Sequence, residues 1–463
     1  MSSALKRNGG TMRIGREHIL LLFIALTISL AGCNNPDKNP EREYNIPTGK
    51  DINFYIATDL HYLSKSLTDG GEAFQNYTSS GDGKQLEYID EILRAFTFEI
   101  KNKKPDILII SGDLTSNGEK ESHLALSQKF KEIENAGTSV YVVPGNHDLL
   151  NPWARGFKGD QRYETEKISD KEFCEIYGDF GYNEAISRDK HTISYLVAPA
   201  EDVWLLMLDT NQYKNNWRNG APQTDGQITQ ETFQWIKKCG ALAKEKGAKL
   251  IPVMHHSLMD HSDVIQKGYT LNNNKQAIAI FQNCDVDFIL SGHIHIQDIS
   301  SYKKDANTIY DIATNALSVY PHQYGVLKYS GENATFDYST SRVDVEGWSK
   351  AEGILDSNIN NFKGYTEEFF GKRAYDMAYN RLIEEPGFTE REIKSMSEIV
   401  KLLNLRYFAG TEALNSTDVI NSEGFALWNA APDSFLKRYV MSILRDKDTE
   451  DNELHVQIRN KNT

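Results

Sequence analysis

The sequence predicts an α/β fold followed by a helical segment. From residue 51 onward, short apolar runs with β character alternate with helical stretches, which is the pattern of an α/β domain. Three later β runs have no helix between them and are expected to form a second sheet packed on the first, at residues 309–312, 325–329 and 334–338. After about residue 345 the β signals stop and the chain is predicted to be helical. We therefore expect an α/β domain at residues 51–344 and a helical domain at residues 345–463.

The first 33 residues have the features of a targeting segment. Arg13 and Arg16 precede an apolar run at residues 19–30, which is shorter than the roughly 20 residues of a transmembrane helix and suits a signal peptide. The run ends in a Leu-Ala-Gly-Cys motif that resembles the lipobox of bacterial lipoproteins, so we expect residues 1–33 to be a signal peptide and Cys33 to carry a lipid. The alternative is an ordinary cleaved signal. Residues 34–50, rich in Asn, Pro and charge, are predicted to form a flexible tether.

The remaining elements follow in chain order. Residues 52–57 are the first expected strand, and apolar residues at helical spacing from Leu86 to Ile100 predict a helix that ends before Pro105. A second helix is expected around residues 124–133. Buried strands are predicted at residues 107–110, 140–143, 203–208, 250–254 and 286–290.

The C-terminal segment carries clear helix signals. Thr389 and Glu392 form a capping box, and the apolar stripe that follows continues to Gly410. The acidic stretch at residues 446–453 is expected to be a solvated tail. We expect helices throughout this segment and make no prediction of the oligomeric state.

Length, charge and cysteine content limit the functional classes. With 463 residues the chain is longer than most single-core domains, in agreement with two domains. A formal net charge of −14 without a basic stripe argues against a nucleic-acid polymer as partner, because binding to backbone phosphates depends on clustered Lys and Arg. Bound cations could still attract an anionic substrate, since surface charge is screened within about 8 Å. Cys174, Cys239 and Cys284 lack CxxC spacing and predict neither a disulfide framework nor a thiolate metal site.

Polar clusters directly follow five of the apolar β runs. Because the carboxyl ends of strands line the binding crevice of an open α/β sheet, these groups are expected to meet at one place. The clusters are Asp59 with His61, Gly112-Asp113, Gly145-Asn146-His147-Asp148, His255-His256, and Gly292-His293-Ile294-His295.

The side chains of these clusters form a set of metal ligands. Carboxylate, amide oxygen and imidazole suit Mn²⁺, Fe or Zn²⁺, and no soft thiolate singles out zinc. Seven candidate ligands are too many for one tetrahedral ion but suit two ions that share a carboxylate. Such a pair can hold the attacking and leaving oxygens of a displacement at phosphorus. We expect two divalent metal ions, with manganese favoured.

In this order, the five clusters resemble the signature of the calcineurin-like metallophosphoesterases, over residues 51 to about 340. The resemblance implies a two-sheet sandwich flanked by helices, a four-layer αββα arrangement, with a metal-activated water as nucleophile. It implies that one metal is held by Asp59, His61 and His295, that the other is held by Asn146, His255 and His293, and that Asp113 bridges the two. His147 would stabilise the transition state or protonate the leaving oxygen, and Asp148 would orient His147.

The fourth cluster departs from the family pattern. Many members have Pro after its histidines, whereas this chain has Ser257, which leaves the shape of the loop open. His255 and His256 are adjacent, so only one need be a ligand. We expect His255 to be the ligand, and His256 to support the site or contact substrate.

Three further histidines receive simpler interpretations. His123 is expected on the surface of a helix, and His261, with Asp260 and Asp263, in a solvated loop. His322 is a candidate for supporting the site or contacting substrate, although a hydrogen-bonded loop histidine is the alternative.

The sequence therefore predicts a metal-dependent phosphodiesterase that is anchored by lipid to a bacterial cell membrane and acts outside the cytoplasm. The lipoprotein start, the long insert after Asp148 and the helical C-terminus resemble bacterial surface enzymes assigned to cyclic-nucleotide phosphodiesterases, so we expect a cyclic nucleotide or a related small diester as substrate. One alternative is a phosphomonoesterase or a hydrolase of glycerophosphodiesters or wall polymers. Another is a surface binding lipoprotein without turnover, against which all seven ligand positions are present.

Overall fold

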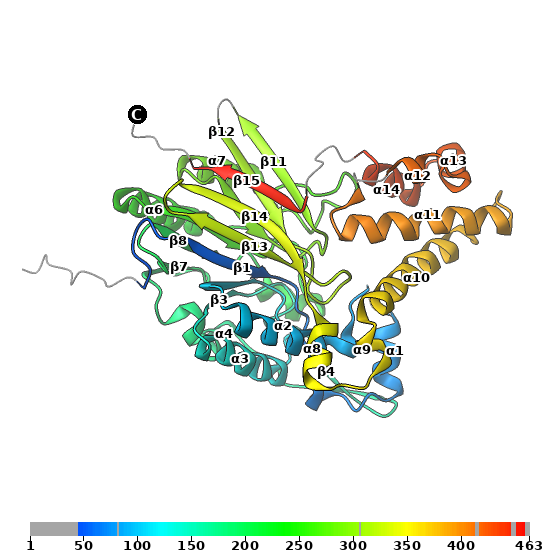
Figure 1. Ribbon diagram of the computed structural model, residues 1–463, viewed down its shortest axis with the longest axis horizontal. Helices are drawn as coiled ribbons and strands as arrows, with labels where there is room; N and C mark the ends of the chain where they lie inside the picture. Colours follow the sequence, from blue (N-terminus) through cyan, green and yellow to red (C-terminus); the bar gives the residue numbers. More distant parts are fainter. Residues whose placement is uncertain (1–44, 81–82, 305–306, 413–415, 446–450, 459–463) are drawn as a thin grey trace, which may run out of the picture. The chain divides into compact units, whose positions relative to one another are not determined.

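Two mixed β-sheets form the centre of the protein, in a computed structural model that describes residues 45–80, 83–304, 307–412, 416–445 and 451–458 (Figure 1). The first sheet has the order β15-β14-β13-β1-β2-β3 and the second the order β11-β12-β10-β9-β8-β7-β6. The predicted second sheet is thus present, but it is not made of the three late runs: two of them, β13 and β14, join β1 and β2 instead.

The first sheet combines the earliest and the latest strands of the chain. β1 pairs in parallel with β2 and antiparallel with β13. Its strands are β1 (Ile52–Ala57), β2 (Ile107–Ser111), β3 (Ser139–Val143), β13 (Gln323–Ser330), β14 (Thr335–Arg342) and β15 (Glu453–Gln457). The helices α2 (Ile89–Lys103), α3 (Lys120–Asn135) and α8 (Val345–Glu352) pack together beside it.

The second sheet has a parallel centre made of β8, β9, β10 and β12. Its strands are β6 (Ser187–Arg188), β7 (Tyr195–Val197), β8 (Val203–Leu208), β9 (Lys249–Met254), β10 (Phe288–Ser291), β11 (Asp298–Lys304) and β12 (Asn307–Ala313). The helices α6 (Gln230–Lys246) and α7 (Asn274–Asn283) contact this sheet and share with it a cluster of buried apolar side chains.

A separate group of helices follows the sheets, as predicted. It comprises α9 (Ser357–Asn360), α10 (Phe362–Leu382), α11 (Glu390–Phe408), α12 (Ser416–Ile420), α13 (Glu423–Ala430) and α14 (Phe435–Ile443). The capping box at the start of α11 is present, because Thr389 and Glu392 each accept a hydrogen bond from the other's backbone amide. The apolar core of these helices includes Ile294 and Ile296, so the group packs directly on the loop that follows β10.

Smaller elements lie between β1 and β2, in the insert between β3 and β8, and between β8 and α6. They are α1 (Glu72–Ser80), the hairpin β4 (Arg155–Lys158) and β5 (Gln161–Glu164), α4 (Asp170–Ile176) and α5 (Asn216–Asn219).

The C-terminus corrects the prediction of an all-helical segment with a solvated acidic tail. β15 returns to the first sheet and pairs antiparallel with β14. Just before it, Asp451 is 2% exposed and accepts a hydrogen bond from the amide of Ile299 (3.1 Å). Charge alone could not indicate this burial, since the amide that Asp451 binds is more than 150 residues away in sequence.

The predicted tether is only partly tested, because residues 1–44, with Cys33 and the predicted signal peptide, lie outside the described residues. Its last residues contact the folded domain. Ile46 forms a β-bridge with Ala200, and the amide of Gly49 donates a hydrogen bond to the carboxylate of Asp202 (3.1 Å). Residues 46 and 49, which were predicted to belong to the tether, are therefore part of the folded body. Among the residues that the structure describes, no helix is both long and apolar enough to span a membrane.

Candidate metal centre

The five predicted clusters meet at the carboxyl ends of β1, β2, β3, β9 and β10. Hydrogen bonds between backbone groups join neighbouring loops: the amides of Asp59 and His61 donate to the carbonyls of Gly112 (3.0 Å) and Asp113 (2.9 Å). The amide of Gly292 donates in the same way to the carbonyl of His255 (3.0 Å). The loops therefore form one hydrogen-bonded unit, which places their side chains in a common volume.

Five of the predicted ligands have a positive φ, which non-glycine residues seldom adopt. The angles are 51° at Asp59, 43° at His61, 48° at Asp113, 71° at His293 and 67° at His295. Such strain persists only where surrounding structure fixes it, and it concentrates at functional sites. Two glycines make the close approach between loops possible: a Cβ at Gly145 would lie 2.1 Å from the amide nitrogen of Asp113, and one at Gly292 would lie 2.0 Å from Thr58 Oγ1.

The first group of side chains contains Asp59, His61 and His295, whose ligand atoms all lie within 4.8 Å of one another. His61 Nε2 and His295 Nε2 are 3.3 Å apart, and Asp59 Oδ1 lies 3.2 Å from His295 Nε2 and 3.7 Å from His61 Nε2. The other oxygen of Asp59 accepts from the Thr58 hydroxyl (2.7 Å) and the amide of His293 (2.8 Å), which fixes the carboxylate. Oδ1 is thus turned toward the two imidazoles.

The second group contains Asp113, His255 and His293, with Asn146 beside them. His255 Nδ1 donates to the carbonyl of Ser111 (3.0 Å), which leaves Nε2 to face Asn146 Oδ1 (3.1 Å) and Asp113 Oδ2 (3.4 Å). His293 Nε2 donates to the carbonyl of Gly268 (2.9 Å), so its Nδ1 is the atom available as a ligand. Carbonyls that fix the tautomer of an imidazole in this way are typical of metal sites.

Asp113 lies between the two groups. Its Oδ2 is 3.4 Å from His255 Nε2 and 3.6 Å from His61 Nε2, while Oδ1 accepts from the amide of His147 (2.8 Å). Burial raises the pKa of Asp113, but the imidazoles of His255 and His147 act against burial and hold this pKa well below its usual range. Asp113 is therefore an ionised carboxylate within reach of both groups.

His147 is positioned at the edge of this constellation. Its Nδ1 donates to the carbonyl of Ser116 (2.9 Å) and lies 3.1 Å from Asn117 Oδ1, and its Nε2 lies 4.0 Å from Asp113 Oδ2. The side chain is 19% exposed, whereas those of Asp59, His61 and His255 are fully buried. His147 can therefore meet a substrate while its Nε2 faces the centre.

The prediction that Asp148 orients His147 is wrong. Asp148 accepts from the amides of Gly145 (2.8 Å), Leu114 (3.0 Å) and Thr115 (3.0 Å), and from the Thr115 hydroxyl (3.0 Å). The carboxylate thus joins the loops after β2 and β3. The groups that orient His147 are the Ser116 carbonyl and Asn117, and neither belongs to the predicted motifs.

His256 and His322 are buried and form hydrogen bonds that support the loops of the site. His256 is fully buried, with Nδ1 2.7 Å from Thr210 Oγ1 and Nε2 donating to the carbonyl of Thr224 (2.9 Å). Its ring lies 4.6 Å from that of His293. His322 is 3% exposed and donates from Nδ1 to the carbonyl of Leu317 (2.9 Å). Both side chains are thus buried and bonded to neighbouring loops, in agreement with a supporting role.

Two histidines that were expected in solvent are buried. His123 lies 2.9 Å from the hydroxyl of Tyr177 and 3.2 Å from the carbonyl of Asp148, and burial lowers its pKa to about 3. His261 lies between two aspartates, with Nδ1 bonded to Asp298 and Nε2 3.1 Å from Asp311 Oδ2. Both predictions failed because the partners are distant in sequence.

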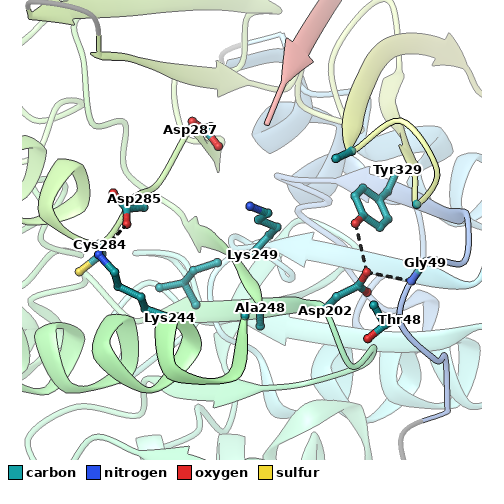
Figure 2. A pocket seen from close by; sticks show the side chains of 14 residues that line it. Thr48, Gly49, Asp202, Lys244, Ala248, Lys249, Cys284, Asp285, Asp287 and Tyr329 are labelled. Carbon is teal, nitrogen blue, oxygen red and sulfur yellow. Dashed lines mark hydrogen bonds and ion pairs between the residues drawn. The ribbon is translucent and has the colours of Figure 1, made fainter. Parts of the chain in front are cut away.

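A cavity lies at the amino ends of β8 and β9, away from the predicted ligands (Figure 2). It is a cavity of about 360 Å³ whose lining includes Asp202, Lys244, Lys249 and Asp285 but no histidine. Lys244 pairs with Asp285 (3.3 Å), and Asp202 accepts from Tyr329 Oη (3.1 Å). The length of β9, six residues or about 20 Å, separates this cavity from the predicted ligands.

Comparison with known proteins supports the metal centre. A family model described as "Calcineurin-like phosphoesterase" matches residues 52–297, just over half of the chain, and one described as "C-terminal domain of cyclic nucleotide phosphodiesterase" matches residues 344–450.

Among relatives, a protein of Arcobacter nitrofigilis named "Probable glycerophosphodiester phosphodiesterase GpdQ" is 23% identical over 267 residues, which cover 56% of this chain and 81% of that protein. A Moraxella catarrhalis protein named "Probable cyclic nucleotide phosphodiesterase" is 22% identical over 216 residues, covering 47% and 67%. A dimetal phosphatase structure from Danio rerio aligns with a TM-score of 0.44 and 12% identity over 62% of this chain and 95% of that one.

The mixed α/β sheets flanked by helices, the helical C-terminal region and the order of the motifs agree with the first of these families. The chain belongs to the calcineurin-like phosphoesterase family and is a metal-dependent phosphoric ester hydrolase.

Proposed function

We propose that the protein hydrolyses small phosphodiesters, with a cyclic nucleotide as the leading substrate, at a centre of two divalent metal ions. The observation that carries the two-metal proposal is the position of Asp113, whose Oδ2 lies 3.4 Å from an imidazole of one ligand group and 3.6 Å from an imidazole of the other. The C-terminal match to a domain of cyclic nucleotide phosphodiesterases supports the choice of substrate.

The residues present fit two metal ions. In the first group two imidazole nitrogens and a carboxylate oxygen point at one another within 4 Å, an arrangement that a cation between them would stabilise. We assign Asp59, His61 and His295 to one ion, Asn146, His255 and His293 to the other, and Asp113 to both. Oxygen and nitrogen donors of this kind suit Mn²⁺, Fe or Zn²⁺, and we favour Mn²⁺. When bound, such ions supply a Lewis acid for the phosphoryl oxygens and lower the pKa of water.

We assign the proton transfer to His147. A carbonyl can only accept, so the bond to Ser116 places a hydrogen on Nδ1 and leaves Nε2 to carry or release the second proton. Nε2 faces the side of Asp113 on which the ligands converge, and the side chain is partly exposed. His147 can thus donate a proton from Nε2 to the leaving oxygen of a bound phosphoester, or stabilise its negative charge.

A second candidate function keeps the centre and changes the substrate. The relative with the larger coverage is named as a glycerophosphodiester phosphodiesterase, which favours glycerophosphodiesters as the alternative. A phosphomonoesterase is the other alternative, because the same ligands could hold a phosphate monoester.

A substrate panel distinguishes these functions. Protein without residues 1–33, stripped of metal and reloaded with Mn²⁺, is incubated with 3′,5′-cyclic AMP, 2′,3′-cyclic AMP, glycerophosphodiesters and a phosphomonoester. We expect cyclic nucleotides to be turned over fastest, with activity lost in EDTA and in His147→Ala. Faster hydrolysis of the glycerophosphodiesters would move the function to that class, and turnover of the monoester alone would make the protein a phosphatase.

We also propose that the protein acts outside the cytoplasm, attached by a lipid on Cys33. The support is the apolar run and the motif that ends at Cys33. Metabolic labelling with a palmitate analogue should mark the wild type but not Cys33→Ser, and the variant should leave the membrane fraction. Equal membrane retention of both proteins without labelling would refute lipid anchoring.

A further inference from the structure

We infer that the helical C-terminal region positions a metal ligand, because its Tyr407 holds the loop of residues 257–271, which in turn fixes the ring of His293. This inference rests on the two-metal site of the proposed function. It gives a role to a region that carries none of the predicted ligands, which all lie between residues 59 and 295. Hydrogen bonds and packing contacts lead from His293 through this loop to α11.

The 257–271 loop fixes the orientation of His293. The carbonyl of Gly268 accepts a hydrogen bond from His293 Nε2 (2.9 Å), which leaves Nδ1 as the ligand atom. The ring of Tyr269 lies beside the same imidazole, with 4.9 Å between the ring centroids. His293 is 5% exposed, so its ring is enclosed by these neighbours. A shift of the loop would therefore change the direction in which Nδ1 points.

The two ends of the loop are bonded to each other beside His255. The amide of Ser257 donates to the carbonyl of Tyr269 (3.1 Å), and the amide of Leu271 donates to the carbonyl of Ser257 (2.9 Å). Ser257 is two residues from His255, a ligand that we assign to the same ion as His293. The loop thus begins next to one imidazole of the second group and returns to the other.

The helical region holds the middle of this loop. The buried hydroxyl of Tyr407, on α11, donates to the carbonyl of His261 (2.8 Å). The side chains of Val264, Ile265 and Tyr269 pack against the apolar cluster that the C-terminal helices form. Tyr269 therefore contacts the ring of His293 and also packs against the apolar cluster of the helices.

The segment that carries His293 packs on the same apolar cluster. Ile294 and Ile296 follow His293 and His295 in alternation, and both isoleucines belong to the cluster of the helices. The helical region thus supports His293 in two ways, through the isoleucines next to it in the chain and through the 257–271 loop that binds its ring.

Tyr407 acts on the metal through the position of other groups. Removing a group that orients a ligand directly typically weakens metal binding about 10- to 100-fold. Tyr407 holds the loop, and the loop holds His293, so we expect a smaller effect of about three- to tenfold. The effect should concern the ion that we assign to Asn146, His255 and His293.

The test compares Tyr407→Phe with the wild type and with Tyr439→Phe as a matched control. Tyr439 is a buried tyrosine of the same cluster, and its hydroxyl lies 2.9 Å from Asn404 Oδ1 on α11, so its variant also loses a buried hydrogen bond, but one within the helices. The metal-free proteins are titrated with Mn²⁺ by calorimetry, and their Tm values are compared. We expect Tyr407→Phe to raise the Kd of one ion about three- to tenfold, and Tyr439→Phe to keep both Kd values within about twofold of the wild type.

Two further variants show that the effect passes through His293. Tyr269→Ala removes the ring beside His293 and should raise the Kd of the same ion about tenfold or more, while Tyr269→Phe keeps the ring and should retain most of the affinity. In a His293→Ala background, Tyr407→Phe should have no further effect on Mn²⁺ binding, because the residue through which it acts is absent.

The outcomes separate this inference from the proposed function. Equal Mn²⁺ affinities of Tyr407→Phe and Tyr439→Phe, or a further loss caused by Tyr407→Phe in the His293→Ala background, would overturn the inference even if diesters are hydrolysed. A loss of affinity for one ion in Tyr407→Phe but not in Tyr439→Phe would support it even if the substrate panel shows no diesterase activity. A wild type that binds a single ion would overturn both the inference and the two-metal proposal.

Discussion

The two ends of β9 carry polar surfaces that differ in how their charges are paired. At the amino end, around the cavity of Figure 2, Lys244 pairs with Asp285 and Asp202 accepts from the Gly49 amide and the Tyr329 hydroxyl. At the carboxyl end, imidazole nitrogens and carboxylate oxygens converge within 4.8 Å. At the amino end these two carboxylates already have a lysine or hydrogen-bond donors of the protein as partners, whereas the converging ligand atoms at the carboxyl end are best satisfied by cations. The convergence of ligand atoms therefore identifies the site better than the presence of a cavity does.

The strongest test of this comparison substitutes one buried aspartate at each end. Asp113→Asn removes the charge that both ligand groups share, and we expect kcat to fall about a thousandfold or more, with loss of bound metal. Asp202→Asn alters a buried carboxylate at the amino end and should leave kcat within about twofold of the wild type. Both variants are measured by diester hydrolysis and by elemental analysis. Full activity of Asp113→Asn would contradict the assignment of the centre.

The second test separates proton transfer from metal binding at the carboxyl end. His147→Asn keeps a side chain that can hydrogen-bond but removes the titrating nitrogen, so kcat should fall about 10²- to 10⁴-fold while both metals remain bound. A substrate with a good leaving group, such as p-nitrophenolate, needs less protonation and should be affected less. If the loss were equal for good and poor leaving groups, His147 would not be the proton donor.

The third test concerns a paired charge that lies behind the ligands. Burial lowers the pKa of His261, but Asp311 and Asp298 raise it to about 10, well above the ordinary value of 6.5. The resulting stabilisation is fully present below pH 6.5 and is lost as pH rises through about 10. His261→Gln leaves two carboxylates without their cation and should cost about 3–5 kcal/mol near pH 6.5.

Thermal unfolding between pH 6 and pH 10 measures this effect. The difference in Tm between the wild type and His261→Gln should shrink toward pH 10. His455→Gln is the control, since His455 forms an exposed pair with Asp337 and its loss should cost about 0–1 kcal/mol. A Tm difference that stays constant over this pH range would show that His261 is not charged in the folded protein.

The fourth test distinguishes Asp148 from His147. Asp148→Asn places an amide against three backbone N–H groups, and we expect a loss of about 1–3 kcal/mol in unfolding free energy. Because the loops after β2 and β3 then shift, kcat should fall about 10- to 100-fold, without the dependence on leaving group expected for His147. A leaving-group dependence equal to that of His147→Asn would restore the predicted orienting role.

The sequence predicted the α/β class, most central strands and the convergence of the five clusters, because each signal was local. Apolar runs define strands, and the polar residues directly after them must lie at strand ends. β15 was not predicted, because its pairing with β14 joins segments more than 100 residues apart. Ser116 and Asn117 were not predicted because their roles depend on loop contacts, and His261 was not predicted as buried because its partners lie on β11 and β12.

The positive φ angles of the ligands could not be predicted from the sequence, because no sequence rule assigns that conformation to a particular Asp or His. Ser116 and Asn117 are short polar residues three and four positions after Asp113, and this is the one signal that could have suggested partners for His147. Spacing within a motif thus identifies ligands, while the groups that orient them come from neighbouring loops.

The smallest effect is expected from a charged pair at the amino end. Lys244 is 72% exposed and its ion pair with Asp285 is 3.3 Å long, so solvent screens most of the attraction. Lys244→Ala should change the unfolding free energy by less than about 1 kcal/mol and leave kcat, KM and metal content unaltered. A change in kcat or metal content in Lys244→Ala would contradict the assignment of the site to the carboxyl end of β9.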